Sequence, residues 1–252
     1  MTLYYLFLTF PHIFPKVFYE WLKMFSLDFL YNAAFTSPSI IYHSLYDMRL
    51  RSTSKIRHIS LPDGEKHNVI VCIHGRGGYP SDFQDLIDKL QPYTNQKFLA
   101  FHLDNAHTLV SEDAIALKEC LDPLMPQIRS MKLIGLSKGG LIAIKYALDL
   151  DRVKRIITVS SPLNGTYMAN NYPFCSNTRK ELAYNSECSQ KLKEQSKHLD
   201  IYSIVPKFDH MIIPIESTYY PHSKTYFYKG YYSHAGIIYA PEVINQIKEW
   251  IF

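Results

Sequence analysis

The chain has 252 residues, of which 47% are hydrophobic and 20% charged, a composition that fits one globular domain with a sizeable core. We expect no second full domain at this length, although a small inserted lid would fit. The formal net charge is +4 and the basic residues form no run along the chain, so we expect no nucleic-acid partner.

Many of the aromatic residues lie in an N-terminal segment, residues 1–50. Met1–Pro15 contains no charged residue, is interrupted by Pro11, and lacks the positively charged start of a secretory signal. It is also shorter than the ~20 residues of a membrane-spanning helix. The segment either buries its aromatic side chains against the core or rests residues 14–31 on a membrane or lipid interface. We therefore expect a cytoplasmic or peripherally membrane-associated protein.

From residue 51 onward the pattern alternates between strands and helices. Lys55–Leu61 alternates as a strand does, and Asn68–Ile73 is a β-branched apolar run of buried-strand length. Residues 74–78 (HGRGG) then form a loop. Ser81 is predicted to cap the next helix, with Gln84 completing a capping box.

The same alternation continues to the end of the chain. Residues 162–199 interrupt it with few aliphatic and many polar side chains, which makes this segment a lid candidate. The order predicts βαβ units, and hence an α/β domain over residues 51–252 with a mostly parallel central sheet and helices on both faces. The remaining expected strands are Lys97–Leu103, Met131–Gly135, Val153–Ser160, Ile201–Val205 and Lys224–Lys229, and the remaining helices are Glu112–Leu121, Lys138–Leu150 and Pro241–Phe252.

Residues 135–139 (GLSKG) match the G-x-S-x-G pattern between a predicted strand and a predicted helix. A serine at such a tight turn takes a strained backbone conformation that exposes its hydroxyl group, and small neighbours prevent collisions there. We therefore predict that Ser137 is a nucleophile, the alternative being a glycine-rich turn with a serine cap. The helix that begins at Lys138 directs free amides at this centre, so the Lys138 amide is a candidate oxyanion donor.

A second oxyanion donor is expected from the loop after an earlier strand. Residues 68–78 (NVIVCIHGRGG) and 133–140 (LIGLSKGG) resemble the bacterial-type serine lipases and esterases of the α/β-hydrolase superfamily. The resemblance implies the α/β-hydrolase fold with a small lid insertion. It also places the second oxyanion amide on Arg76 and makes His74 a residue that orients the loop through hydrogen bonds.

A serine hydroxyl group needs a base, and the base needs an orienting carboxylate. In this superfamily the chain order is serine, acid, histidine. His234 follows the last predicted strand and precedes the final helix, where the sequence resembles the end of lipases, and His222 is the next candidate. Asp209 lies at the carboxyl end of a predicted strand, whereas Asp200 lies at the opposite end, away from the expected site.

These residues predict a serine hydrolase of carboxylic esters that needs no metal or organic cofactor. The expected partner is a small-molecule ester or lipid substrate, because residues 160–166 also resemble a lipase loop. A thioesterase or acyltransferase would use the same three side chains and remains an alternative. So does a non-catalytic, membrane-associated binding module, whereas a haloalkane dehalogenase would have Asp in place of Ser137.

The four cysteines match no zinc or redox spacing. Cys72 and Cys120 lie in apolar segments and are expected in the core. Cys175 and Cys188 share one polar segment, and the sequence leaves open whether a disulfide joins them.

Overall fold

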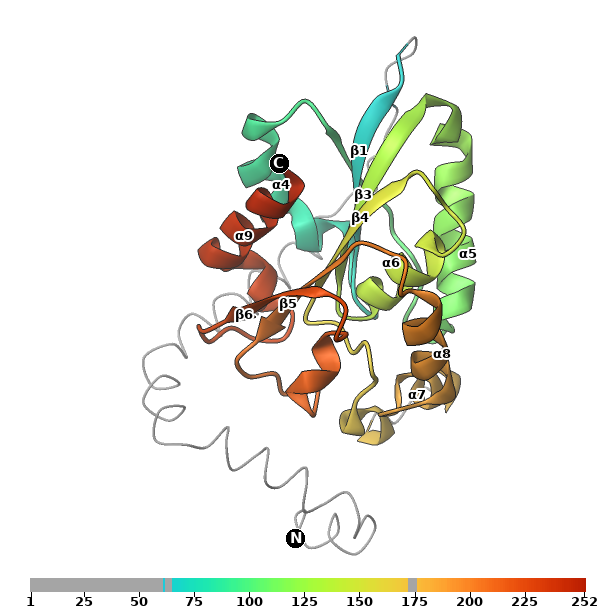
Figure 1. The fold of residues 1–252 in the computed structure, drawn as a ribbon, viewed down its shortest axis with the longest axis vertical. Helices are drawn as coiled ribbons and strands as arrows, with labels where there is room; N and C mark the ends of the chain where they lie inside the picture. Colours follow the sequence, from blue (N-terminus) through green and yellow to red (C-terminus); the bar gives the residue numbers. More distant parts are fainter. Residues whose placement is uncertain (1–60, 62–64, 172–175) are drawn as a thin grey trace, which may run out of the picture.

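The structure, a computed structural model, describes residues 61, 65–171 and 176–252 (Figure 1). The expectations for residues 1–50 and for a strand at residues 55–61 lie outside the described part, apart from Leu61, which is buried. Within that part, no helix combines the length and the apolar character needed to cross a lipid bilayer.

Six parallel strands form one sheet in the described part, in the order β2-β1-β3-β4-β5-β6. The mostly parallel α/β sheet expected from the sequence is therefore confirmed. Its strands are rich in Val and Ile because a parallel sheet covered on both faces is buried throughout. The strands are β1 His67–Ile73, β2 Lys97–Ala100, β3 Ile128–Leu136, β4 Val153–Val159, β5 Ile201–Pro206 and β6 Lys224–Tyr228.

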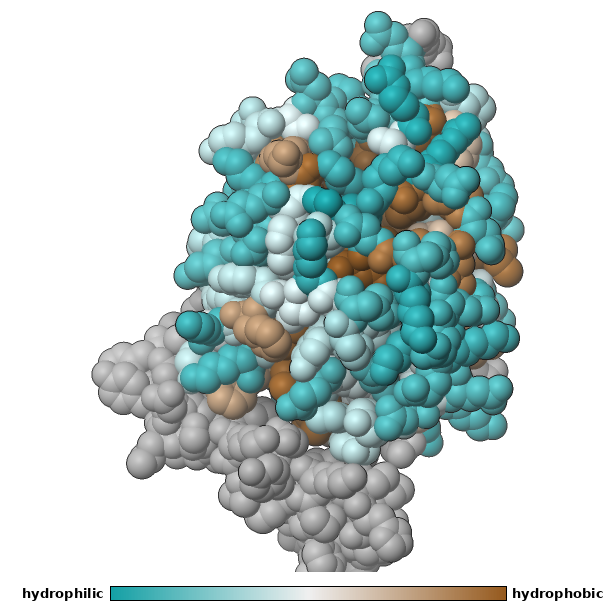
Figure 2. All heavy atoms as spheres, in the orientation of Figure 1, coloured by the Kyte–Doolittle hydropathy of each residue, from teal (hydrophilic) through white to brown (hydrophobic). Residues whose placement is uncertain are grey.

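Helices cover both faces of the sheet, with α4 and α9 on one side and α5 and α6 on the other (Figure 1). Successive residues of β1 show why two cores form: Val71 joins the cluster beneath α5 and α6, and Cys72 joins the cluster beneath α4 and α9. The α-helices are α4 Gln84–Leu90, α5 Val110–Leu121, α6 Lys138–Ala147, α7 Ser176–Leu182, α8 Glu187–Gln195 and α9 Pro241–Ile251. The outer face seen in Figure 2 is mostly hydrophilic, with smaller hydrophobic areas between the polar side chains.

The predicted start of the first helix at Ser81 is wrong. A 3₁₀ turn, Pro80–Phe83, precedes α4, and the cap is made by Asp82, whose Oδ2 accepts the Tyr79 amide at 3.0 Å. Pro80 fixes the backbone at the first position of this turn, so the chain begins to coil one residue before Ser81. The second strand is also shorter than expected and ends at Ala100.

The lid candidate, residues 162–199, contains a 3₁₀ turn at Tyr167–Asn171 and the helices α7 and α8. Two side chains of α7 hold it against the start of α5. Thr178 Oγ1 donates to the Thr108 carbonyl at 2.9 Å, and Glu181 Oε2 accepts from the Val110 amide at 2.7 Å. The segment is therefore anchored beside the carboxyl edge of the sheet.

The strand order reverses at β1, although all the strands run in the same direction. It leaves β1 to form β2 on one side, and then returns to form β3 on the other side of β1. The loops after β1 and β3 consequently separate above the sheet and leave a crevice, which is where open α/β sheets bind ligands. Residues 74–78 and Ser137 are the residues that follow these two strands.

Candidate active site

Ser137 lies between β3 and α6 with φ 54° and ψ −125°. A residue other than glycine is strained at this positive φ, and the surrounding structure must hold its backbone there. The Ser137 amide donates to the Val159 carbonyl of the adjacent strand at 2.9 Å, which fixes the turn to the sheet. The turn raises the hydroxyl group out of the sheet and into the crevice.

Two glycines allow the turn to fit against the sheet. A Cβ atom on Gly139 would lie 2.1 Å from the Ile73 carbonyl oxygen, and one on Gly135 would lie 2.4 Å from the Gly139 carbonyl oxygen. Both contacts are with the backbone, so no side-chain rotation would relieve them. The close approach of α6 to β1 and β3 therefore requires glycine at both positions.

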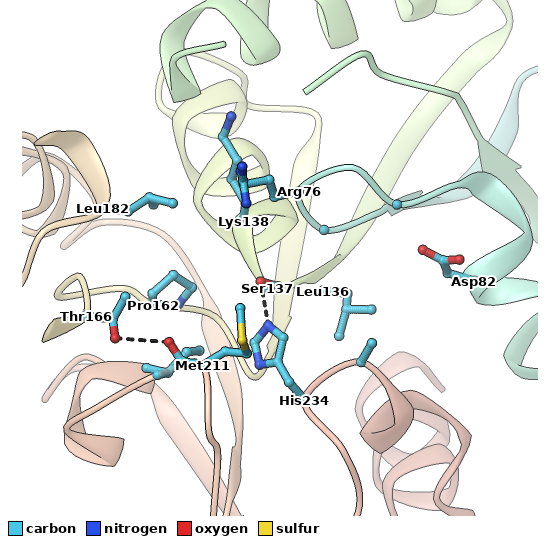
Figure 3. Close-up of a pocket in the computed structure, with 14 residues that line it drawn as sticks. Arg76, Asp82, Leu136, Ser137, Lys138, Pro162, Thr166, Leu182, Met211 and His234 are labelled. Carbon is cyan, nitrogen blue, oxygen red and sulfur yellow. Dashed lines mark hydrogen bonds between the residues drawn. The ribbon is translucent and has the colours of Figure 1, made fainter. Parts of the chain in front are cut away.

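The structure brings Ser137, His234 and Asp209 into one hydrogen-bonded chain. His234 Nε2 lies 2.8 Å from Ser137 Oγ (Figure 3), and His234 Nδ1 lies 2.6 Å from Asp209 Oδ2. An ionised carboxylate only accepts hydrogen bonds, so the imidazole proton is on Nδ1 and Nε2 accepts from the serine. Nε2 is therefore the atom that is free to take the serine proton.

Asp209 is held ionised by its surroundings. Burial acts to raise its pKa, but the charge interaction with His234 and the hydrogen bonds that the carboxylate accepts outweigh burial and lower the pKa. Oδ1 accepts the amides of Met211 and Ile212 at 2.7 and 3.1 Å, and Oδ2 accepts from His234 and Ser160. An ionised Asp209 orients the imidazole by accepting the hydrogen bond from Nδ1.

Ser160 is a site residue to which the sequence analysis gave no individual role. It follows β4, has a φ of 46°, and is fully buried. Its hydroxyl group donates to Asp209 Oδ2 and lies 3.5 Å from His234 Nδ1. The signal available in the sequence was its position at the carboxyl end of a strand, the same signal that selected Asp209.

The loop after β1 is held in a tight turn beside Ser137. The Gly78 amide donates to the Gly75 carbonyl at 3.0 Å, and Gly77 has a φ of 62°. His74 is completely buried and orients the loop, as expected: its Nδ1 donates to the Gly75 carbonyl at 2.8 Å, and its Nε2 accepts the Leu103 amide at 2.9 Å. Arg76, the residue proposed as an oxyanion donor, is therefore on a fixed turn.

Lys138 places its backbone and its side chain in different environments. As the first residue of α6, it has an amide without an intrahelical acceptor, next to the Ser137 hydroxyl group. Its side chain is buried and points away from the crevice, as the side chain of Arg76 also does (Figure 3). The ammonium group forms an ion pair with Asp113 at 2.6 Å.

A cleft of about 110 Å³ opens at Ser137 and His234. The lid candidate contributes Leu182 to its wall, and the loop after Asp209 contributes Met211 (Figure 3). One side of the cleft is apolar, whereas the loop after β1 supplies polar groups on the other side. The remaining lining residues are Gly75, Arg76, Gly78, Asp82, Leu136, Lys138, Pro162, Thr166, Ile212 and Ala235.

The alternative acid and base lie away from this cleft. Asp200 precedes β5 and pairs with Arg155 at 2.8 Å, and His222 precedes β6 and stacks on Tyr220. Both therefore lie at the amino ends of strands, opposite to Ser137.

No group of three or more His, Cys, Asp or Glu side chains within the described ranges is arranged to hold a metal ion.

Cys72, Cys120 and Cys188 do not line the cleft. Cys72 is buried in the cluster beneath α4 and α9, and Cys120 packs against the cluster beneath α5 and α6, as predicted. The Cys188 thiol is unbridged and donates to Glu181 Oε1 at 3.5 Å, and burial raises its pKa to about 11. Cys175 lies outside the described residues.

No protein-family model and no curated protein matches the chain. Solved structures do resemble it. The lin2722 gene product of Listeria innocua is 17% identical with a TM-score of 0.56, over 74% of this chain and 94% of that one. The mature lipase BlEst2 of Bacillus licheniformis is 15% identical with a TM-score of 0.54, over 79% and 95%. The esterase Pf2001 of Pyrococcus furiosus is 15% identical with a TM-score of 0.56, over 75% and 83%.

The parallel sheet with helices on both faces, together with these likenesses, shows that the chain has the α/β-hydrolase fold. Lipases and esterases are among the proteins that share this fold with it. The expected fold class is therefore confirmed. At 15–17% identity the likeness concerns the fold alone.

Proposed function

We propose that this protein is a serine hydrolase that cleaves carboxylic esters through an acyl-enzyme intermediate. The observation that carries the proposal is the 2.8 Å hydrogen bond between Ser137 Oγ and His234 Nε2, on a serine held at φ 54°. A glycine-rich turn with a serine cap has no need for a histidine aligned on its hydroxyl group by a buried aspartate. The same alignment also opposes the non-catalytic binding module.

In the acylation half of the reaction, Ser137 Oγ attacks the ester carbonyl carbon and its proton passes to His234 Nε2. Asp209 stabilises the imidazolium that forms. The amides of Arg76 and Lys138 donate to the negatively charged carbonyl oxygen. When the tetrahedral intermediate collapses, the bond to the alcohol oxygen breaks, and the alcohol leaves with the proton from His234.

In the deacylation half, water attacks the acyl carbon and gives its proton to His234. The second tetrahedral intermediate collapses by breaking the bond to Ser137 Oγ, which recovers the proton. The carboxylic acid leaves and the enzyme returns to its starting state. A thioesterase would differ only in the sulfur leaving group, and an acyltransferase only in the acceptor that replaces water.

Because one side of the cleft is apolar, we propose that the cleft binds the acyl chain of the ester. The chain would run past Leu182 and Met211. The described cleft, at about 110 Å³, is small beside the several hundred Å³ of a typical ligand pocket. A long chain would therefore extend out of the cleft over the lid candidate, residues 162–199. A lipid-like ester remains our proposal for the natural substrate, with the lid candidate as the surface that receives its chain.

A series of chromogenic esters from acetate to laurate, with and without detergent micelles, tests this function. We expect ester turnover by the wild-type protein and none above background by Ser137→Ala. Adding a competing alcohol and analysing the products separates hydrolysis from acyl transfer. Equal turnover by the two proteins would refute the proposal.

A further inference from the structure

The Lys138 side chain carries its charge into the core. If this position had only a structural role, an apolar side chain would fill it. The residue is 1% exposed, and the residues that follow it in α6 belong to the core. Its partner, Asp113, is 3% exposed. Taking two charges out of water is costly, and a buried pair is often no more stable than apolar residues of similar size. Stability alone therefore does not account for this pair.

The ammonium group joins three segments of the chain. Besides the ion pair with Asp113 in the first turn of α5, it donates to the carbonyl of Asn105 at 3.0 Å and to that of Thr108 at 2.6 Å. Two of its hydrogens are thus directed at carbonyl acceptors, and Asp113 Oδ2 lies beside it as the balancing charge. Thr108 Oγ1 also donates to Asp113 Oδ1 at 2.5 Å. Residues 105–108 are consequently fixed to the start of α6.

The same residues hold the loop after β1. The buried side chain of Asn105 donates to the Gly75 carbonyl at 3.2 Å and accepts the Gly77 amide at 2.8 Å. Arg76 Nε donates to the Ala106 carbonyl at 2.9 Å. Residues 105–108 therefore fix the turn that presents the Arg76 amide through hydrogen bonds to its backbone and to the Arg76 side chain.

The two candidate oxyanion donors are thus connected through one bridge. It runs from the Lys138 side chain to residues 105–108, and from there to the turn that contains Arg76. Oxyanion donors act within a narrow range, about 2.7–3.1 Å from the oxygen on which charge develops. A bridge that fixes the separation of the two amides therefore bears directly on the rate of the chemical step.

We propose that the Lys138 side chain is a positioning residue that sets the separation between the two oxyanion amides, with Asp113 fixing its ammonium group. The inference rests on the proposed esterase function. The role belongs to the side chain and is separate from that of the Lys138 amide. It predicts that losing the ammonium group weakens binding of the tetrahedral state more than binding of the ester.

The test compares wild-type protein with the double variant Lys138→Met/Asp113→Leu, which leaves no unpaired buried charge. We expect kcat to fall about tenfold or more. The fall should be smaller than the one caused by removing a whole donor, because both amides remain and are only displaced. We expect KM to change by less than about threefold, because the ester is bound before charge develops. The affinity for a trifluoromethyl ketone, which forms a tetrahedral adduct with the serine, should fall in parallel with kcat.

Lys132→Met is the matched control, because the Lys132 ammonium group also donates to a main-chain carbonyl, that of Ile251, far from the cleft. It should leave kcat and ketone affinity unchanged. If the double variant does not fold, Asp113→Asn tests the part of the inference that concerns Asp113: it keeps the shape and the Lys138 ammonium group but removes the charge that fixes it, and kcat and ketone affinity should again fall together. A folded variant that retains wild-type kcat and ketone affinity would overturn the inference. Wild-type protein that neither turns over esters nor binds the ketone would overturn the proposed function as well.

Discussion

The hydroxyl group of Ser160 donates to Asp209 Oδ2, the same oxygen that receives the Nδ1 proton of His234. Ser160 is held at φ 46° with its amide bonded to the Ile204 carbonyl, so the backbone aims this hydroxyl group at the carboxylate. With Oδ1 occupied by two amides, the carboxylate has little freedom to rotate. Ser160 therefore helps to fix the direction in which Asp209 holds the imidazole.

Ser160→Ala should lower both stability and activity. A hydrogen bond to a charged group contributes about 1.5–3 kcal/mol, so we expect a loss of this size in the free energy of unfolding, measured by denaturant titration. We also expect a lower kcat, because the carboxylate gains freedom. Ser203→Ala is the control: it removes a buried hydroxyl group bonded to Thr158 and Ser223, and should leave kcat unchanged. Unchanged kcat in Ser160→Ala would contradict the positioning role.

Asp209→Asn should remove most of the activity while leaving Ser137 in place. The amide can donate to Nδ1, which would shift the imidazole proton to Nε2 and leave no base facing the serine. In serine hydrolases with this arrangement, such a change costs about 10⁴-fold in kcat. Steady-state kinetics on a soluble ester provides the measurement. A loss of less than about tenfold would argue against His234 as the base that Asp209 orients.

The lowered pKa of Asp209 predicts how stability depends on acid. In the unfolded chain the carboxyl group titrates near its ordinary value of about 3.9, and in the folded protein it titrates lower. Between these two values the unfolded state binds more protons, so stability rises with pH. The contribution is therefore present above about pH 4 and is lost as the pH falls through the folded pKa.

Thermal unfolding of wild-type protein and Asp209→Asn across that acidic range measures this contribution. The variant lacks the titrating group, so its Tm should fall less steeply with acid than the wild-type Tm. Parallel curves for the two proteins would show that Asp209 has an ordinary pKa.

Two glycine substitutions separate steric collision from backbone strain. Gly139→Ala would place a Cβ atom 2.1 Å from the Ile73 carbonyl oxygen, so α6 must move and we expect loss of activity with a large fall in Tm. Gly77→Ala meets only an ordinary van der Waals contact, with the Ala106 side chain at 3.8 Å, but has a φ of 62°. It should cost about 1–2 kcal/mol. Circular dichroism melts of both variants measure the difference, and equal losses would contradict the packing at the turn.

The strands that carry the site could be predicted from the sequence. The apolar run before residue 74 is β-branched, the shorter run before residue 137 (MKLIGL) leads into a glycine-flanked serine, and the glycines at 135 and 139 have a local steric reason. Because parallel strands end at one edge, the positions of Ser137, Asp209 and His234 after predicted strands were enough to expect them near each other.

Other features depend on contacts between distant segments. Ser160 is 49 residues from Asp209, and no local pattern indicates that a serine at the end of β4 takes a positive φ. Lys138 has a charged side chain, which a sequence pattern alone would place on the surface. It is buried instead, and Asp113 and two carbonyls compensate its charge there. The sequence predicts a cap at Ser81, whereas in the structure Asp82 accepts the Tyr79 amide at the start of the turn before α4.

The central claim is that Ser137 is an activated nucleophile. Its most direct test is the intact mass of the folded protein after incubation with a fluorophosphonate, followed by peptide mapping of the adduct. We predict one phosphonyl group per chain, on Ser137, and none on folded Ser137→Ala protein. Folded wild-type protein that stays unmodified, or that is modified on another residue, would contradict the account.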